Sequence, residues 1–181
     1  MNTNYDSQVN EILTKHGLDF TISKRALSAK DDEGKDMLSP YFGLYNDKLG
    51  LCINTCKEGY TISQNGEIVE MILRGMEKFG ENLHVTKAGS LNDGRKTYIQ
   101  IAIDGNGKVG NDTVRRFITA IDSNDGSTGL SIGIGDLTMS CQNQFFKFYK
   151  AGDAKFRHTA TIEKKIQTIP YLIETALNVS L

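Results

Sequence analysis

The stretch KTYIQIAIDGNGKVGNDTVRRFITAIDSNDGSTGLSIGIG, residues 96–135, decides the fold that we predict for this chain. Apolar and polar residues alternate in it, as they do in strands with one face buried. Asn, Asp and Gly separate the alternating runs and tolerate the positive φ of tight turns. Connections this short join antiparallel neighbours, because parallel strands need long crossovers. Together with the run before it, the stretch predicts a meander of strands over residues 83–91, 96–103, 114–122 and 130–139.

Helical and strand patterns flank the meander. We expect helices over residues 4–15, 67–79 and 142–150, with strands over 18–27 and within 41–55. A last helix should begin near residue 160 and be split by Pro170, because proline lacks the donor that a helix interior needs. The apolar phase changes between Ile134 and Leu137, which predicts a β-bulge at Gly133 and Gly135. The order of elements predicts one α+β domain over 1–181, an antiparallel β-meander packed with helices, with a mobile charged loop at 28–39.

Composition predicts a globular protein without a membrane partner. The chain has 181 residues, of which 39% are apolar and 24% charged, a balance that suits one domain with a core. No apolar run is long enough for a membrane helix, and the first residues lack the blocks of a signal peptide. Three cysteines without framework spacing indicate a reduced compartment. We therefore expect a cytoplasmic protein; the resemblance described below implies that the cytoplasm is that of a bacterial host.

The net charge of −1 conceals two halves of opposite sign. Residues 1–84 carry a net charge of −4, whereas residues 85–165 carry +4. A polyanion would therefore meet the second half of the chain.

Motifs for cofactors are incomplete, and we expect neither a metal nor a nucleotide cofactor. Gly105, Gly107 and Gly110 match the letters of a dinucleotide fingerprint, but a strand is predicted where that motif needs a helix. Cys52 and Cys56 lack a second pair of zinc ligands with recognisable spacing. Cys141 and His158 could pair as nucleophile and base, although a cysteine in an apolar pattern is more often simply buried.

Two sets of polar residues are candidate sites. Phosphate neutralisation needs several cations together, and single-strand binding adds aromatic faces for the bases. The residues that fit this DNA-binding role are Arg95, Lys96, Tyr98, Arg115, Arg116, Lys147, Lys150, Lys155 and Arg157. A second candidate polar site comprises Asp125, Ser127, Thr128, Cys141, Asn143 and His158. The aromatic residues within 141–159 share a helical face that is typical of a core, although the lysines among them could still bind phosphate.

An ordered set of short motifs resembles a phage- and plasmid-borne family known mainly as a domain of unknown function. The match covers roughly residues 17–178, and each piece is weak alone. Its pieces are LDFT at 18–21, Tyr60-x₃-Gln64-Asn65, AGSL at 88–91 with Gly94-Arg95, Ser123-x-Asp125-Gly126-Ser127-Thr128, CQN at 141–143 and RHT at 157–159. A meander followed by a helix is also similar to the core of single-strand annealing recombinases, which form rings or filaments around a basic groove.

The resemblance implies a single-stranded DNA-binding and annealing protein that acts in recombination as a homo-oligomer, as a ring or filament. One alternative is a nucleotide-binding protein or enzyme of phage defence or counter-defence that uses Asp125, Cys141 and His158. Another is a structural protein whose oligomer faces are its function. Single-stranded nucleic acid and further copies of the chain are the partners that we expect.

Overall fold

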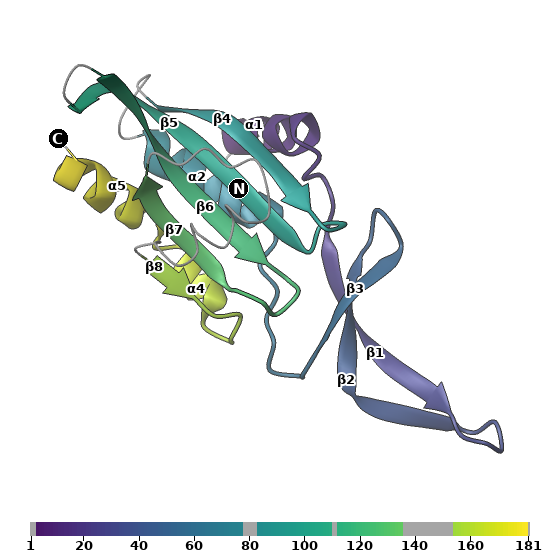
Figure 1. Ribbon diagram of the computed structural model, residues 1–181. Helices are drawn as coiled ribbons and strands as arrows, with labels where there is room; N and C mark the ends of the chain where they lie inside the picture. The colour runs from purple at the N-terminus through teal and green to yellow at the C-terminus, as the bar shows by residue number, and fades with distance from the viewer. Residues whose placement is uncertain (1–2, 78–82, 110–111, 136–153, 181) are drawn as a thin grey trace.

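The computed structural model describes residues 3–77, 83–109, 112–135 and 154–180, and its fold is α+β with two antiparallel sheets (Figure 1). The first sheet has the order β1-β2-β3, with strands Ile22–Lys30, Asp36–Asn46 and Leu51–Cys56. The second has the order β4-β5-β6-β7-β8, with strands Leu83–Leu91, Lys96–Val109, Asp112–Ser123, Leu130–Gly135 and Ala154–Phe156. The three-stranded sheet, here called the arm, projects from the rest of the molecule.

The five-stranded sheet and the helices form the body of the protein. The helices are α1 (Thr3–Lys15), α2 (Asn65–Glu77), α4 (Ile162–Ile166) and α5 (Ile169–Ser180). Figure 1 shows α2 behind the sheet, where it packs against α1 and α5. Buried isoleucines of β5 and β6 form the core with Ile72 of α2 and Ile173 of α5. Alternation in the strands thus supplies one continuous apolar face for the helices.

The opposite face of the central strands is buried as well. Ala102, Ile121 and Phe117 on this face are buried, although the alternation alone would leave it half-exposed. Polar residues on it are paired across the strands, and the Gln100 Nε2 donates to the Thr119 Oγ1 at 3.0 Å. Both faces of β5 and β6 are therefore largely buried over residues 97–102 and 117–121, whereas Arg116 is exposed.

The arm is anchored at its base and exposed beyond it. Leu44 and Ile53 at the base are buried with the core of the body. The third strand pairs with β2 only from Phe42 to Asn46, so residues 36–41 of β2 have only β1 as a neighbouring strand. This two-stranded outer part is here called the outer arm. It ends in the turn between Lys30 and Asp36.

Several predicted elements are confirmed, and others need correction. Pro170 divides the last helical segment, since α4 ends at Ile166 and α5 begins at Ile169. The predicted loop at 28–39 is wrong at both ends, because the strands continue to Lys30 and resume at Asp36. No β-bulge occurs at Gly133, since β6 and β7 pair in unbroken register from Phe117 to Ile121, and the residues after Gly135 lie outside the described part of the chain.

The longest strands run further than the alternation predicted. β5 continues to Val109 and β6 begins at Asp112, with a register shift between Ile103 and Gly107. The glycine-rich letters thus lie within a hairpin, and a strand follows them. The predicted helix at 142–150 lies outside the described residues. Among the described residues, none of the helices has the length and apolarity to cross a bilayer.

Candidate functional site

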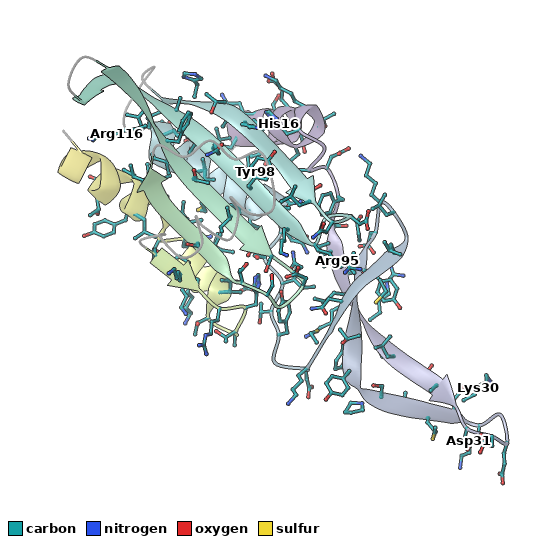
Figure 2. The ribbon with its side chains drawn as sticks, viewed as in Figure 1. His16, Lys30, Asp31, Arg95, Tyr98 and Arg116 are labelled. Atoms are coloured by element: carbon teal, nitrogen blue, oxygen red, sulfur yellow. The ribbon has the colours of Figure 1, made fainter. Side chains whose placement is uncertain are left out.

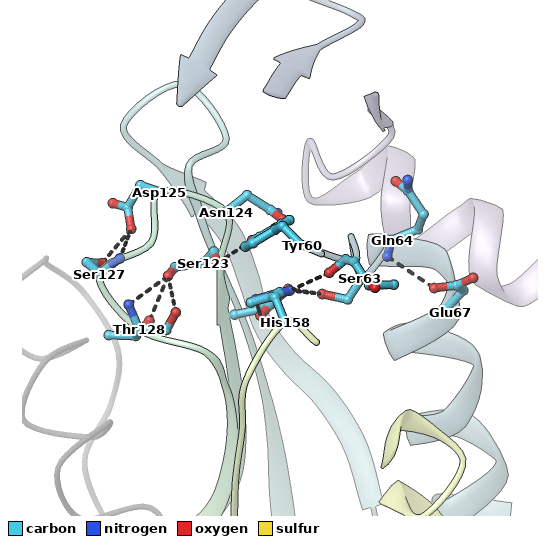
Figure 3. A network of polar contacts seen from close by, with 12 residues as sticks. Tyr60, Ser63, Gln64, Glu67, Ser123, Asn124, Asp125, Ser127, Thr128 and His158 are labelled. Carbon is cyan, nitrogen blue, oxygen red and sulfur yellow. Dashed lines mark hydrogen bonds and ion pairs between the residues drawn. The ribbon is translucent and has the colours of Figure 1, made fainter. Parts of the chain in front are cut away.

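Polar side chains from four separate segments meet at the end of the body from which the arm departs (Figure 3). The register places the start of β5 opposite the end of β6, with Lys96 beside Ser123. The turn at 124–129 follows, and the residues after β8 lie next to it because Leu130 pairs with Phe156. The linker between β3 and α2 completes the group, since the Thr61 N–H donates to the His158 carbonyl at 3.3 Å.

The centre of this group is a buried contact among Ser63, Asp122 and His158. The Ser63 Oγ donates to the Asp122 Oδ2 at 2.5 Å. The other carboxylate oxygen, Oδ1, lies 2.9 Å from the His158 Nε2. This second contact is an ion pair when the imidazole is protonated. The remaining ring nitrogen, Nδ1, lies 3.2 Å from the Thr61 carbonyl oxygen, to which it can donate.

Tyr60 and Asn124 extend the buried contact toward the arm. The Tyr60 ring stacks on the His158 ring, with centroids 4.9 Å apart and planes 15° apart. Its hydroxyl donates to the Asn124 Oδ1 at 3.2 Å, and the Asn54 Nδ2 of β3 donates to the Asn124 carbonyl oxygen at 3.2 Å. We call Tyr60, Ser63, Asp122, Asn124 and His158 the polar junction.

The surroundings of His158 favour its charged form. Burial lowers the pKa of the imidazole, but the Asp122 carboxylate and the carbonyls of Thr61 and Ser123 outweigh this and raise the pKa overall. A ring whose two nitrogens face a carbonyl and a carboxylate has donors on both sides only when protonated. When His158 is protonated, it forms a buried ion pair with Asp122 at the centre of the polar junction. The contacts of Ser63 and Thr61 join the linker to β6 and to the segment after β8.

Lys96 and Asp125 form a second buried pair beside the polar junction. Their Nζ and Oδ2 atoms are 3.0 Å apart, and the Lys96 residue is only 3% exposed. Asp125 also accepts hydrogen bonds from the backbone N–H and the hydroxyl of Ser127. Burial opposes ionisation of Asp125, but the hydrogen bonds from Ser127 and Lys96 prevail and lower its pKa. Lys96 therefore stabilises the turn at 124–129.

The rest of the turn is fixed by Ser123 and Thr128. The Ser123 Oγ donates to the Thr128 carbonyl oxygen and accepts from the Thr128 N–H, both at 3.1 Å. A side chain at Gly129 would place its Cβ 2.0 Å from the Phe156 carbonyl oxygen, so this close approach requires glycine. The hydrogen bonds between Ser123 and Thr128 fix the shape of the turn, and Gly129 allows the turn to lie directly against β8.

The geometry around Ser63 does not suit a serine nucleophile. The Ser63 hydroxyl donates to the carboxylate, and the His158 Nδ1 is 3.5 Å from the Ser63 Oγ. General-base activation would need the imidazole to accept that proton. Ser63, Asp122 and His158 are all buried. Of the alternative enzyme set, Asp125 pairs with Lys96 and His158 with Asp122, whereas Cys141 lies outside the described residues.

The predicted basic residues are divided between the two ends of the body (Figure 2). Arg95 lies beside the arm, whereas Arg116 lies at the far end, because Arg116 pairs with Ile103 and Lys96 with Ser123. Lys96 is buried in its ion pair, so its predicted exposure to DNA is wrong. Tyr98 is half-buried, and this burial raises its pKa. These residues do not form one continuous cationic surface.

A different part of the predicted set is exposed on one segment. Lys155 in β8 and Arg157 directly after it are both exposed, and Lys164 is exposed on α4. The side chain of Arg115 and the remaining candidates lie outside the described residues; these are Cys141, Asn143, Lys147 and Lys150.

Sequence reasoning missed Ser63 and Asp122 as members of a site. Asp122 ends a predicted strand and Ser63 lies in a predicted loop, so no spacing relates them. A signal was present in Tyr60 and Gln64, which carry part of the resemblance. Gln64 bonds both backbone groups of Ile22, with its Nε2 donating at 2.8 Å and its Oε1 accepting at 3.1 Å. Motif residues far apart in sequence thus converge where the arm meets the body.

The fold and the junction define a small α+β protein with a buried polar centre at one end of its large sheet. Residues 53–180 match the family described as Domain of unknown function (DUF932), and the chain belongs to this family. The match confirms the expectation that the chain belongs to a family known as a domain of unknown function. The matched region begins at residue 53, whereas the resemblance in the sequence begins at about residue 17. No curated protein and no solved structure matches the chain.

Proposed function

We propose that this protein binds single-stranded nucleic acid through the exposed residues of Lys155–Lys165, here called the basic segment. The observation that carries the proposal is the charge of this segment. It contains four cations, Lys155, Arg157, Lys164 and Lys165, and one carboxylate, Glu163. Binding that neutralises several phosphates at once releases their counterions, and it needs such a cluster.

The positions of the cations on the surface support binding of a nucleic-acid strand by the basic segment. Two exposed cations, Lys155 and Arg157, flank Phe156 at the edge of the five-stranded sheet. The Lys165 Nζ lies 5.8 Å from the centroid of the Phe156 ring, which keeps this cation on the same part of the surface. Lys155 points to the face of β8 opposite Phe156, so the cations of β8 and α4 border this edge strand from its two sides.

The polar junction supports the proposal indirectly. It fixes His158, which lies between the cations of β8 and those of α4, to the body through Asp122 and Thr61. A rigid segment loses less conformational entropy on binding than a flexible one. The junction therefore serves to hold the basic segment, and it is not itself the surface for the ligand.

Annealing, action as a homo-oligomer and a setting on a phage or plasmid belong to the same proposal. They rest on the resemblance and on its similarity to single-strand annealing proteins. In such a mechanism the protein presents an extended strand with its bases exposed, so that no chemistry on the protein is needed.

The test measures binding of fluorescein-labelled oligo(dT) by anisotropy between about 50 and 200 mM salt. The variant Arg157→Glu with Lys164→Glu should weaken binding and flatten the slope of log K against log salt by about 1.4, because two phosphate contacts are lost. The matched control is Lys15→Glu with Lys57→Glu, two exposed lysines in other regions. Equal weakening by both pairs would remove the basic segment from the site. A wild-type protein without salt-dependent binding would refute the proposed function.

A further inference from the structure

Exposed apolar side chains are concentrated on the arm. Among the described residues, six large hydrophobic side chains are exposed, and five of them lie on the arm. These are Met37, Leu38, Tyr41, Leu49 and Leu51. Leu38 is 83% exposed, and Met37 is 50% exposed. Scattered single apolar residues are normal on a surface, but a concentration of them on one projection marks an interaction site.

The outer arm also lacks the usual support of a strand pair. Residues 36–38 pair only with β1, residues 39–41 lie at a shift of the β1–β2 register, and the outer arm is largely exposed to solvent. An isolated two-stranded hairpin is marginally stable in water, and stability comes from a third strand or from packing on another element. A binding partner would supply this packing.

The charge of the turn indicates which partner this is. From Lys30 to Asp36 the turn contains four carboxylates and two lysines, and one of these lysines, Lys30, already pairs with Asp36 at 3.5 Å. The turn is therefore acidic. The basic segment of the same chain, with four cations and one carboxylate, is its complement in sign. Complementary patches of this kind steer association and fix its register.

We propose that the outer arm of one copy docks on the body of a second copy of this chain, with its acidic turn against the second copy's basic segment. The apolar contact is made by Met37, Leu38 and Tyr41. Because the arm and the basic segment are different surfaces, the interface is heterologous, and successive copies form a closed ring or an open filament. This inference deepens the proposed homo-oligomer and rests on it.

The two parts of the interface have different consequences for the ligand. The proposed nucleic-acid strand and the acidic turn would use the same cations, so a bound strand would displace the turn. The apolar contact does not depend on those cations. The interface can therefore persist when a strand occupies the basic segment.

The first experiment measures self-association by sedimentation velocity across protein concentrations, without nucleic acid. Leu38→Asp should weaken self-association more than tenfold, because it places a charge in the apolar contact. The matched control is Tyr171→Asp, which changes an equally large side chain, 67% exposed, on α5. Circular dichroism should show that both variants keep the fold. A monomeric wild type, or equal effects of the two variants, would overturn the proposal.

The second experiment uses reversed charges to identify the surface that receives the turn. One variant carries Asp32→Lys and Glu33→Lys in the arm, and the other carries Arg157→Glu and Lys164→Glu in the basic segment. Each alone brings like charges together and should associate poorly. A mixture should recover self-association, because each arm then faces a segment of opposite sign. A mixture that stays dissociated would exclude the basic segment as the receiving surface.

These outcomes are separate from those of the oligo(dT) experiment. If the wild type self-associates as described but does not bind oligo(dT), the nucleic-acid proposal fails and the arm interface stands. If the protein binds oligo(dT) while the Leu38 variant self-associates like the wild type, the arm interface fails alone.

Discussion

The arm and the body are both antiparallel sheets, yet only the body is enclosed by its own chain. In the body, both faces of β5 and β6 are largely buried, and even polar residues such as Gln100 are fully enclosed. In the outer arm, hydrophobic residues such as Leu38 lie in solvent. The same alternation of residue types thus serves two purposes. Burial within the chain stabilises the body, whereas the outer arm has a surface that suits another molecule.

The largest expected difference between the two regions concerns buried and exposed aliphatic side chains. Ile101→Ala should lower the free energy of unfolding by about 4 kcal/mol, because it leaves a cavity in the core. Leu38→Ala should change it by less than about 0.5 kcal/mol in dilute solution. Urea unfolding followed by circular dichroism measures both. Similar losses from the two substitutions would show that the outer arm is packed within its own chain.

A second expected difference concerns ion pairs. Asp122→Asn should cost about 3 kcal/mol in unfolding free energy, because it leaves His158 buried without its counter-charge. Asp47→Asn should cost much less, because its pair with Arg25 on the arm is half in solvent. Thermal unfolding of both variants at one pH provides the comparison. A larger loss from Asp47 would contradict the central role given to the polar junction.

Two glycines with positive φ, one beside the base of the arm and one at its tip, are expected to differ in how much their substitution destabilises the protein. Gly94→Ala should destabilise the protein by about 2 kcal/mol, because φ is +87° and the new Cβ would lie 2.6 Å from the Asn46 Nδ2. Gly34→Ala in the turn of the arm, with φ of +80° and no neighbour within 4 Å, should cost about 1 kcal/mol. Chemical denaturation measures both. Equal losses of stability would show that Asn46 can move away from the added methyl group at position 94 without a cost in free energy.

The smallest expected effect is a pH dependence from the polar junction. The folded-state pKa of His158 lies above the unfolded value of about 6.5, so the protonated ring adds stability below that pH. This contribution is lost as the pH rises through the folded-state pKa. Unfolding free energies measured across this range should therefore decrease with pH, and His158→Gln should flatten the decrease.

Much of the fold could be predicted from local patterns, and much of the site could not. Alternation at Ile99, Ile101 and Ile103 predicts β5, and Pro170 predicts the break between the last two helices. The three-residue strand β8 was not predicted, because it is too short to show a period. The continuation of β5 to Val109 was missed because Gly and Asn are typical of turns.

Charge in the sequence was a poor guide to exposure. Lys96 was assigned to a DNA surface because it follows Arg95, yet it pairs with Asp125 inside the protein. Lys96 is in phase with Gln100 and Ala102, both of which are buried. Only the three-dimensional structure shows that this second face is enclosed. Contacts such as Ser63 with Asp122, which are 59 positions apart, have no local signal at all.

The orientation of the arm depends on a small base. Two asparagine side chains of the arm, Asn46 and Asn54, donate to backbone carbonyl oxygens of Asp93 and Asn124 in turns of the body. The 11 residues of β2 span about 33 Å from Asn46 to Asp36, so a tilt of about 10° at the base moves the tip by about 6 Å. A small change of angle at the base of the arm therefore causes a large displacement of its tip. If copies join through it, this angle sets the curvature of the assembly and decides between closure and continued growth.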